Sequence, residues 1–154
     1  MSTASQSEEK AYHQQIIPIM GLLGSISFAG LVLVLQNPSN FRVSVMIGPS
    51  FLIPATYVNS AQYFQTLVTL LMAASTLSIV GGVAAAEVSS FSGSTRLLSA
   101  FARLCCWVGI FAFFWVMPLL TYPAVQNSQL FGDILIFEGV LVVILGFLTR
   151  GFKI

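Results

Sequence analysis

Charged residues are scarce in this sequence. Six Lys or Arg and five Asp or Glu make up only 7% of its 154 residues, whereas about a quarter of an ordinary soluble domain is charged. So few charges cannot cover a soluble protein of this size, because Lys, Glu, Arg and Asp supply most of a water-exposed polar surface. Since 56% of the residues are apolar or aromatic, the sequence predicts an integral membrane protein.

The residues that build catalytic and metal centres are also few. The only histidine is His13, and the only cysteines, Cys105 and Cys106, are adjacent. On a helix two such side chains point about 100° apart, which suits neither a relaxed disulfide nor a zinc site. Motifs of nucleotide-binding proteins, serine hydrolases and zinc proteases are missing, and a net charge of +1 gives no basic surface for nucleic acid. We therefore expect a protein that is not an enzyme, with no cofactor, no metal and no nucleic-acid partner.

What the sequence does contain is long apolar runs. A bilayer core of about 30 Å requires about 20 helical residues to cross it. The runs are continuous, whereas a membrane β-strand alternates apolar and polar residues. The sequence therefore predicts an all-α integral membrane bundle of four transmembrane helices in a single domain. The predicted spans are 16–35, 64–86, 97–120 and 130–148.

The positions of Lys and Arg predict the orientation of the bundle. With four spans the two termini share one side of the membrane, and residues 1–15, rich in Ser, Thr and Gln, are expected to form a mobile tail there. Because basic residues near span ends stay in the cytoplasm, we expect both termini to be cytoplasmic. The basic residues on that side are Lys10, Arg96, Arg150 and Lys153, with Arg103 just inside the third span, against Arg42 on the other side.

The connection between the first two spans, residues 36–63, is not a polar loop. Its centre is nearly uncharged but holds two prolines and a glycine, so it is too short and too broken to cross the membrane. A segment of this kind either caps the outer ends of the helices or dips back as a re-entrant loop. We favour the cap, because the segment contains no charged or repeated filter motif.

Small residues recur at regular spacing on three of the predicted helices. Close packing of small residues drives helix association in lipid, so we expect these lines to pack the bundle, and one of them to mediate self-association in the alternative interpretation. The lines are Gly21, Ser25 and Ala29 in the first span, Ala74, Ser78, Gly82 and Ala86 in the second, and Gly132, Gly139 and Gly146 in the fourth.

Three charged residues lie within the predicted spans, where each costs at least about 2.5 kcal/mol at the membrane centre. Asp133 is close to the outer end of the fourth span, whereas Glu138 is near its middle and has to be protonated, paired or in contact with water. Glu138, with Asp133 beside it, is therefore the candidate ion or proton site. Arg103 is expected to pair with Glu87 at the cytoplasmic side, since both lie at a similar depth.

Two functions follow from this pattern. The first is a small membrane protein that assembles in the bilayer, either with itself or as a subunit of a larger membrane complex. The alternative is an ion or proton channel or carrier in which several copies surround a path lined by Glu138, because four helices from one chain are too few to enclose a wide pore.

Overall fold

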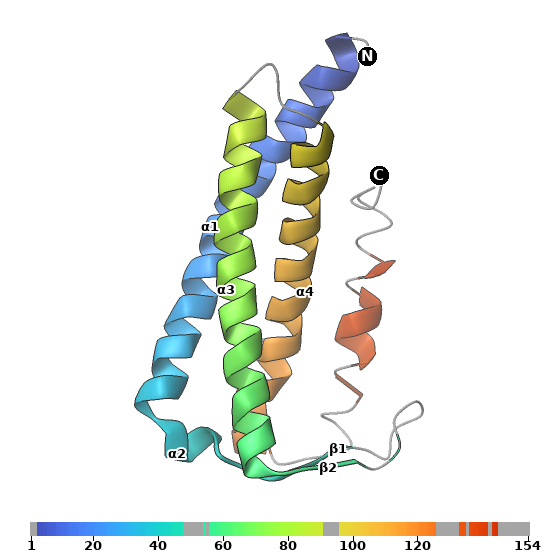
Figure 1. The fold of residues 1–154 in the computed structure, drawn as a ribbon. Coiled ribbons are helices and arrows are strands. Elements are labelled where there is room, and N and C mark those ends of the chain that lie inside the picture. The colour runs from blue at the N-terminus through green and yellow to red at the C-terminus, as the bar shows by residue number, and fades with distance from the viewer. Residues whose placement is uncertain are drawn as a thin grey trace.

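The protein is described here by a computed structural model, which covers residues 3–47, 54, 56–90, 96–125, 133–134, 136–141 and 143–144. Three long helices dominate it, and a short helix and a hairpin of two strands join the first two of them (Figure 1). In chain order the elements are α1 (Thr3–Gln36), α2 (Pro38–Phe41), β1 (Val45–Ile47), β2 (Thr56–Val58), α3 (Ser60–Ser90) and α4 (Arg96–Val125).

The three long helices are each long and apolar enough to cross a membrane. Their apolar stretches are Lys10–Gln36, Ser60–Ser90 and Leu97–Pro123, which confirms that the first three predicted spans are helical and that the protein has the character of a membrane protein. The fourth predicted span, 130–148, falls only partly within the described residues. Those described are helical, and residues 136–141 are drawn beside α4 (Figure 1).

The helices are longer than the apolar runs that predicted them. The first helix already begins at Thr3, so it passes through most of the stretch that the sequence analysis assigned to a mobile tail. The last, α4, contains Pro118 and continues beyond Leu120, through Pro123, to Val125. Apolar runs mark where lipid begins and ends, whereas a helix ends where its backbone hydrogen bonds stop being satisfied.

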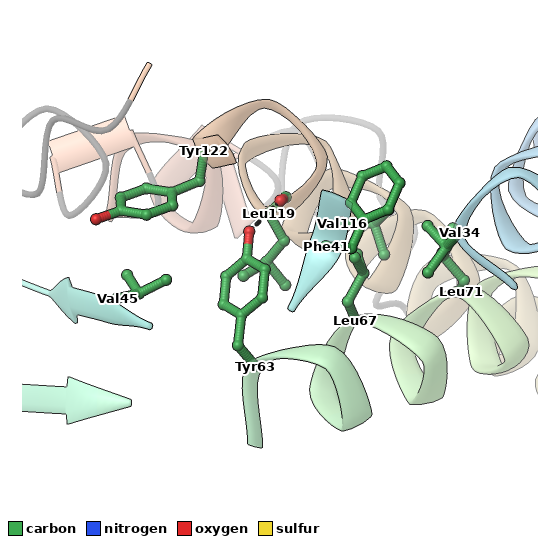
Figure 2. Packing of buried hydrophobic residues seen from close by; sticks show 9 residues of the cluster. All are labelled: Val34, Phe41, Val45, Tyr63, Leu67, Leu71, Val116, Leu119 and Tyr122. Atoms are coloured by element: carbon green, nitrogen blue, oxygen red, sulfur yellow. Dashed lines mark hydrogen bonds between the residues drawn. The ribbon is translucent and has the colours of Figure 1, made fainter. Parts of the chain in front are cut away.

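One side chain explains how α4 tolerates Pro123. Proline has no N–H, so the carbonyl of Leu119, four residues earlier, loses its partner within the helix. The phenol of Tyr63, at the start of α3, donates a hydrogen bond to that carbonyl (Figure 2). A neighbouring helix thus satisfies the backbone group that the proline leaves unpaired, as membrane helices with internal prolines require.

The central helix is α3, which packs along most of its length against both α1 and α4, whereas α1 and α4 touch each other much less. The buried residues of α3 and α4 alternate steps of three and four, the period of about 3.5 residues that keeps one face of a helix against its neighbours. On α3 they include Leu71, Ala74, Ser78, Gly81, Ala85 and Val88, and on α4 Ser99, Ala102, Cys106 and Gly109.

The buried edge of α1 repeats at seven residues. Its members, His13, Met20, Ser27 and Val34, are each at most 1% exposed. Because two turns of a packed helix take about seven residues, these four side chains form one line toward the rest of the bundle. The line begins at His13, three residues before the predicted span does, so the packed part of α1 extends beyond the apolar run.

The described elements of the connection between α1 and α3, which are α2, β1 and β2, lie across the ends of the long helices (Figure 1), as expected for a cap. Strands β1 and β2 pair antiparallel, with Val45 opposite Val58 and Met46 opposite Tyr57. Phe41 of α2 and Val45 of β1 are buried in the apolar cluster at this end. Figure 2 shows that cluster: Val34, Phe41, Val45, Tyr63, Leu67, Leu71, Val116, Leu119 and Tyr122.

Candidate functional site

The small-residue line of α3 is only half inside the bundle. Ala74 and Ser78 are fully buried, whereas Gly82 and Ala86 are half-buried. Four residues advance a helix by about 40° more than one turn, so a line with four-residue spacing drifts out of a contact whose period is 3.5. The glycine that continues the buried line is Gly81.

Gly81 marks the closest approach of α3 to α4. A Cβ atom at this position would lie 3.1 Å from both the backbone nitrogen and the sulfur of Cys106, and 3.2 Å from Cβ of Cys105. On α4, Gly109 makes a similarly close contact with α3, because a Cβ atom added to it would lie 3.2 Å from the hydroxyl oxygen of Ser78. Contacts this short are tighter than most Cβ contacts in proteins, so a side chain at either glycine would push the two helices apart by a few tenths of an ångström.

On α1 the predicted small-residue line points away from the bundle. Gly21, Ser25 and Ala29 are all exposed, and a Cβ atom at Gly21 would meet nothing within 4 Å. The inward glycine is Gly24, whose carbonyl accepts a hydrogen bond of 3.4 Å from the Ser75 hydroxyl. The helix therefore has one glycine face filled by α3 and another that none of the described residues covers.

In the fourth predicted span only one of the three glycines can be placed, since Gly132 and Gly146 fall outside the described residues. Gly139 is half-buried, and a Cβ atom added to it would lie 4.0 Å from the indole nitrogen of Trp115 on α4. This contact places the 136–141 segment against α4.

Glu138 is next to that contact. The residue is half-buried, and its Oε2 atom is out of solvent with no hydrogen-bond partner among the described residues. The same is true of the Trp115 indole nitrogen. Asp133, by contrast, is exposed. The two acids are therefore in different surroundings, and Glu138 is the one that is withdrawn from solvent.

A polar cluster that the sequence analysis did not anticipate joins α1 to α4. Nε2 of His13 lies 3.1 Å from the Ser99 hydroxyl, and the guanidinium of Arg103 lies 5.3 Å from the ring centre of Tyr12. All four residues are within the first two turns or so of the apolar stretches Lys10–Gln36 and Leu97–Pro123. The cluster therefore lies at one boundary of the apolar belt.

The His13–Ser99 pair has the separation of a base and a nucleophile in a hydrolase. His13 is 1% and Ser99 5% exposed, so neither is open to a substrate, and the pair fits an interhelical hydrogen bond. Glu87 is exposed near the end of α3, and the contact shown for the Arg103 side chain is the ring of Tyr12. The ion pair between Glu87 and Arg103 stays a prediction.

The feature of the sequence that could have revealed His13 is that it begins a series with seven-residue spacing, followed by Met20, Ser27 and Val34. The apolar run begins after it, so a search by hydropathy excludes it. Elsewhere in the described part of the chain no three His, Cys, Asp or Glu side chains gather as metal ligands, and Cys105 and Cys106 are buried free thiols.

Comparison with known proteins gives no match: no family model, no curated protein and no solved structure is similar to this chain.

Proposed function

We propose that this chain is a non-enzymatic membrane protein of four spans that associates with itself in the bilayer. The observation that carries the proposal is the open face of α1. In the most apolar 18 residues of α1 only 17% are buried, against 39% for α3 and 44% for α4. The helix is held mainly from one side, by α3.

The contrast between two glycines of α1 supports this assignment. Gly24 meets Ser78 of α3, with 3.4 Å between its added Cβ and the serine Cβ, whereas Gly21 meets nothing. Lipid tails are as apolar as leucine, so helices associate in a bilayer through close backbone packing rather than by escaping water. The Ser25 hydroxyl is bonded to the carbonyl of Gly21 at 2.8 Å, which keeps this face smooth and free of an outward polar group.

Cross-linking in nanodiscs tests the proposal. In a protein without Cys105 and Cys106, we expect Ser25→Cys to form a disulfide-linked dimer under mild oxidation. Thr76→Cys is the matched control, because Thr76 is also exposed and lies at the same level of the neighbouring helix α3. Equal cross-linking at the two positions would contradict a specific α1 interface.

A second variant separates association from folding. Gly21→Leu adds a side chain where nothing lies within 4 Å, so the thermal stability of the single chain should persist while the dimer is lost. We expect size-exclusion chromatography with light scattering to show the smaller species. An unchanged distribution of sizes would mean that this face contacts only lipid.

The proposed layout places both termini and the 87–96 connection in the cytoplasm, because most Lys and Arg flank those ends. A single cysteine at Ser5 should then be protected from an impermeant reagent in intact cells, and one at Ser60 should react. The reverse pattern would invert the topology, and reaction at both positions would contradict an arrangement with Ser5 inside and Ser60 outside.

Transport of protons or cations by an oligomer is the second candidate. It is favoured by the buried oxygen of Glu138, which has no partner among the described residues. Reconstituted vesicles should then show an ion flux that falls steeply in Glu138→Gln. Vesicles without flux would leave self-association as the function to pursue.

A further inference from the structure

A Cβ atom added at Gly139 would lie 4.0 Å from the Trp115 indole nitrogen of α4. That nitrogen and the Oε2 atom of the preceding residue, Glu138, are both out of solvent with no hydrogen-bond partner among the described residues. The exposed side chains of the segment include Phe137 at 67% and Val140 at 51%, whereas Glu138 and Gly139 are half-buried. The segment therefore has an outer apolar face suited to lipid and an inner face that carries the carboxyl group. Lipid covers neither a carboxyl oxygen nor an indole N–H with a hydrogen bond.

In the part of the chain that the structure describes, the charged residues of α4 and of the segment itself do not neutralise a carboxylate at this contact. The charged residues of α4 are Arg96 and Arg103, and Arg103 is twelve residues from Trp115, which is about 18 Å along the helix. The other titratable groups of α4 are the two cysteines, ten and nine residues away, and Tyr122, about 10 Å along. Asp133, on the segment itself, has the same sign as Glu138. An indole N–H stabilises a carboxylate by donating to it but supplies no net positive charge.

We infer that Glu138 is a proton-binding site, held between the 136–141 segment and Trp115 of α4, and that the bound proton keeps the segment packed against α4. A neutral carboxylic acid costs far less to place in an apolar contact than an unpaired carboxylate. Loss of the proton leaves a buried charge, and the nearest cation of α4, Arg103, is about three helical turns from Trp115 at the separation given above. The segment then shifts to bring the carboxylate toward water. This inference concerns the binding site alone and holds whether or not the protein self-associates or transports ions.

Labelling of the unmodified protein tests the site directly. An apolar carbodiimide in the bilayer reacts with protonated carboxyl groups, and mass spectrometry of the digested protein identifies which Asp or Glu is modified. We expect modification of Glu138 that decreases as the pH rises, with Asp133 and Glu87 unmodified because both are exposed. Absence of labelling at Glu138 at every pH, or equal labelling of Asp133, would overturn the inference.

The fluorescence of Trp115 tests whether the bound proton keeps the 136–141 segment packed against α4. The protein has two tryptophans, so Trp107→Phe leaves Trp115 as the only residue excited at 295 nm, a wavelength that tyrosine does not absorb. We expect its fluorescence in nanodiscs to change with pH in a one-proton step. The step should disappear in Glu138→Gln and persist in the control Asp133→Asn.

Three other results of the fluorescence experiment would contradict a proton site at Glu138. A pH profile unchanged by Glu138→Gln, or abolished by Asp133→Asn, overturns the assignment. A midpoint that moves when sodium replaces choline at constant ionic strength makes the ligand a metal cation rather than a proton. Because the carbodiimide experiment uses the wild-type chain, a folding defect in Glu138→Gln leaves the inference open to refutation by labelling.

Discussion

Replacing Gly81 by alanine is the sharpest test of the packing between α3 and α4. The added methyl group would lie 3.1 Å from the Cys106 backbone nitrogen and 3.2 Å from Cβ of Cys105. Neither atom is at the end of a flexible side chain, so neither moves away unless α4 shifts as a whole. We expect the helices to separate by a few tenths of an ångström and to lose contacts along the interface.

The magnitude follows from two opposing effects. Overpacking a filled core costs about 1–3 kcal/mol, whereas alanine gains about 1 kcal/mol over glycine in helix propensity. The adjacent Gly82 isolates the first effect, because a Cβ atom there meets only Met20 Cβ at an ordinary 3.6 Å. Gly82→Ala has the same propensity gain without the clash. The difference in unfolding free energy between the two variants should therefore equal the overpacking cost, about 1–3 kcal/mol.

Reversible unfolding by sodium dodecyl sulfate in mixed micelles, followed by circular dichroism, measures this difference. Gly81→Ala should unfold at a lower detergent fraction than Gly82→Ala. Gly109→Ala, which would place a Cβ atom 3.2 Å from the Ser78 hydroxyl oxygen, should resemble Gly81→Ala. If Gly81→Ala proves as stable as Gly82→Ala, the close approach of the two helices at this level is wrong.

Other substitutions test the hydrogen bonds between helices. Tyr63→Phe removes the donor to the Leu119 carbonyl and should lower the unfolding free energy by about 1–3 kcal/mol, since a buried acceptor is left unpaired; Tyr57→Phe, at 65% exposure, should change it little, and equal effects would refute the role of Tyr63. Ser99→Ala removes the hydroxyl that lies 3.1 Å from His13 and should cost about 1 kcal/mol. Hydrogen exchange should then be faster in the first turns of α1, and unchanged exchange would mean that the bond does not hold them.

Hydropathy predicted three of the spans because a segment that crosses lipid has to be apolar, and hydropathy measures how apolar a segment is. A run of about 20 apolar residues has few structures open to it in a bilayer other than a helix, so 16–35, 64–86 and 97–120 fall within α1, α3 and α4. The residues at which the helices begin and end could not be predicted from the apolar runs. The passage of α4 through Pro123 depends on Tyr63, which is 60 residues earlier in the sequence.

The inner faces were predicted only in part, because burial in this protein does not follow hydrophobicity. On α1, Leu22 and Phe28 are 62% and 59% exposed, whereas Ser27 is 1% exposed. In a soluble helix this pattern would be inverted, since water drives large apolar side chains inward. In a bilayer both faces of the helix are in apolar surroundings, and the inner face is set by what lets backbones approach or pairs polar groups.

The evidence for the inner face therefore lies in the period rather than in the residue type. Spacing of four residues selected Gly21 on α1 and Gly82 on α3, which the structure places respectively outside the bundle and at its edge. Spacing of seven connects His13 to Val34 and would have identified the whole buried line of α1. Helices that stay in contact over several turns keep a period near 3.5 residues. The α3 set with four-residue spacing leaves such a contact after one turn, since Ala74 and Ser78 are buried whereas Gly82 and Ala86 are half-buried. The α1 set, Gly21, Ser25 and Ala29, is exposed throughout.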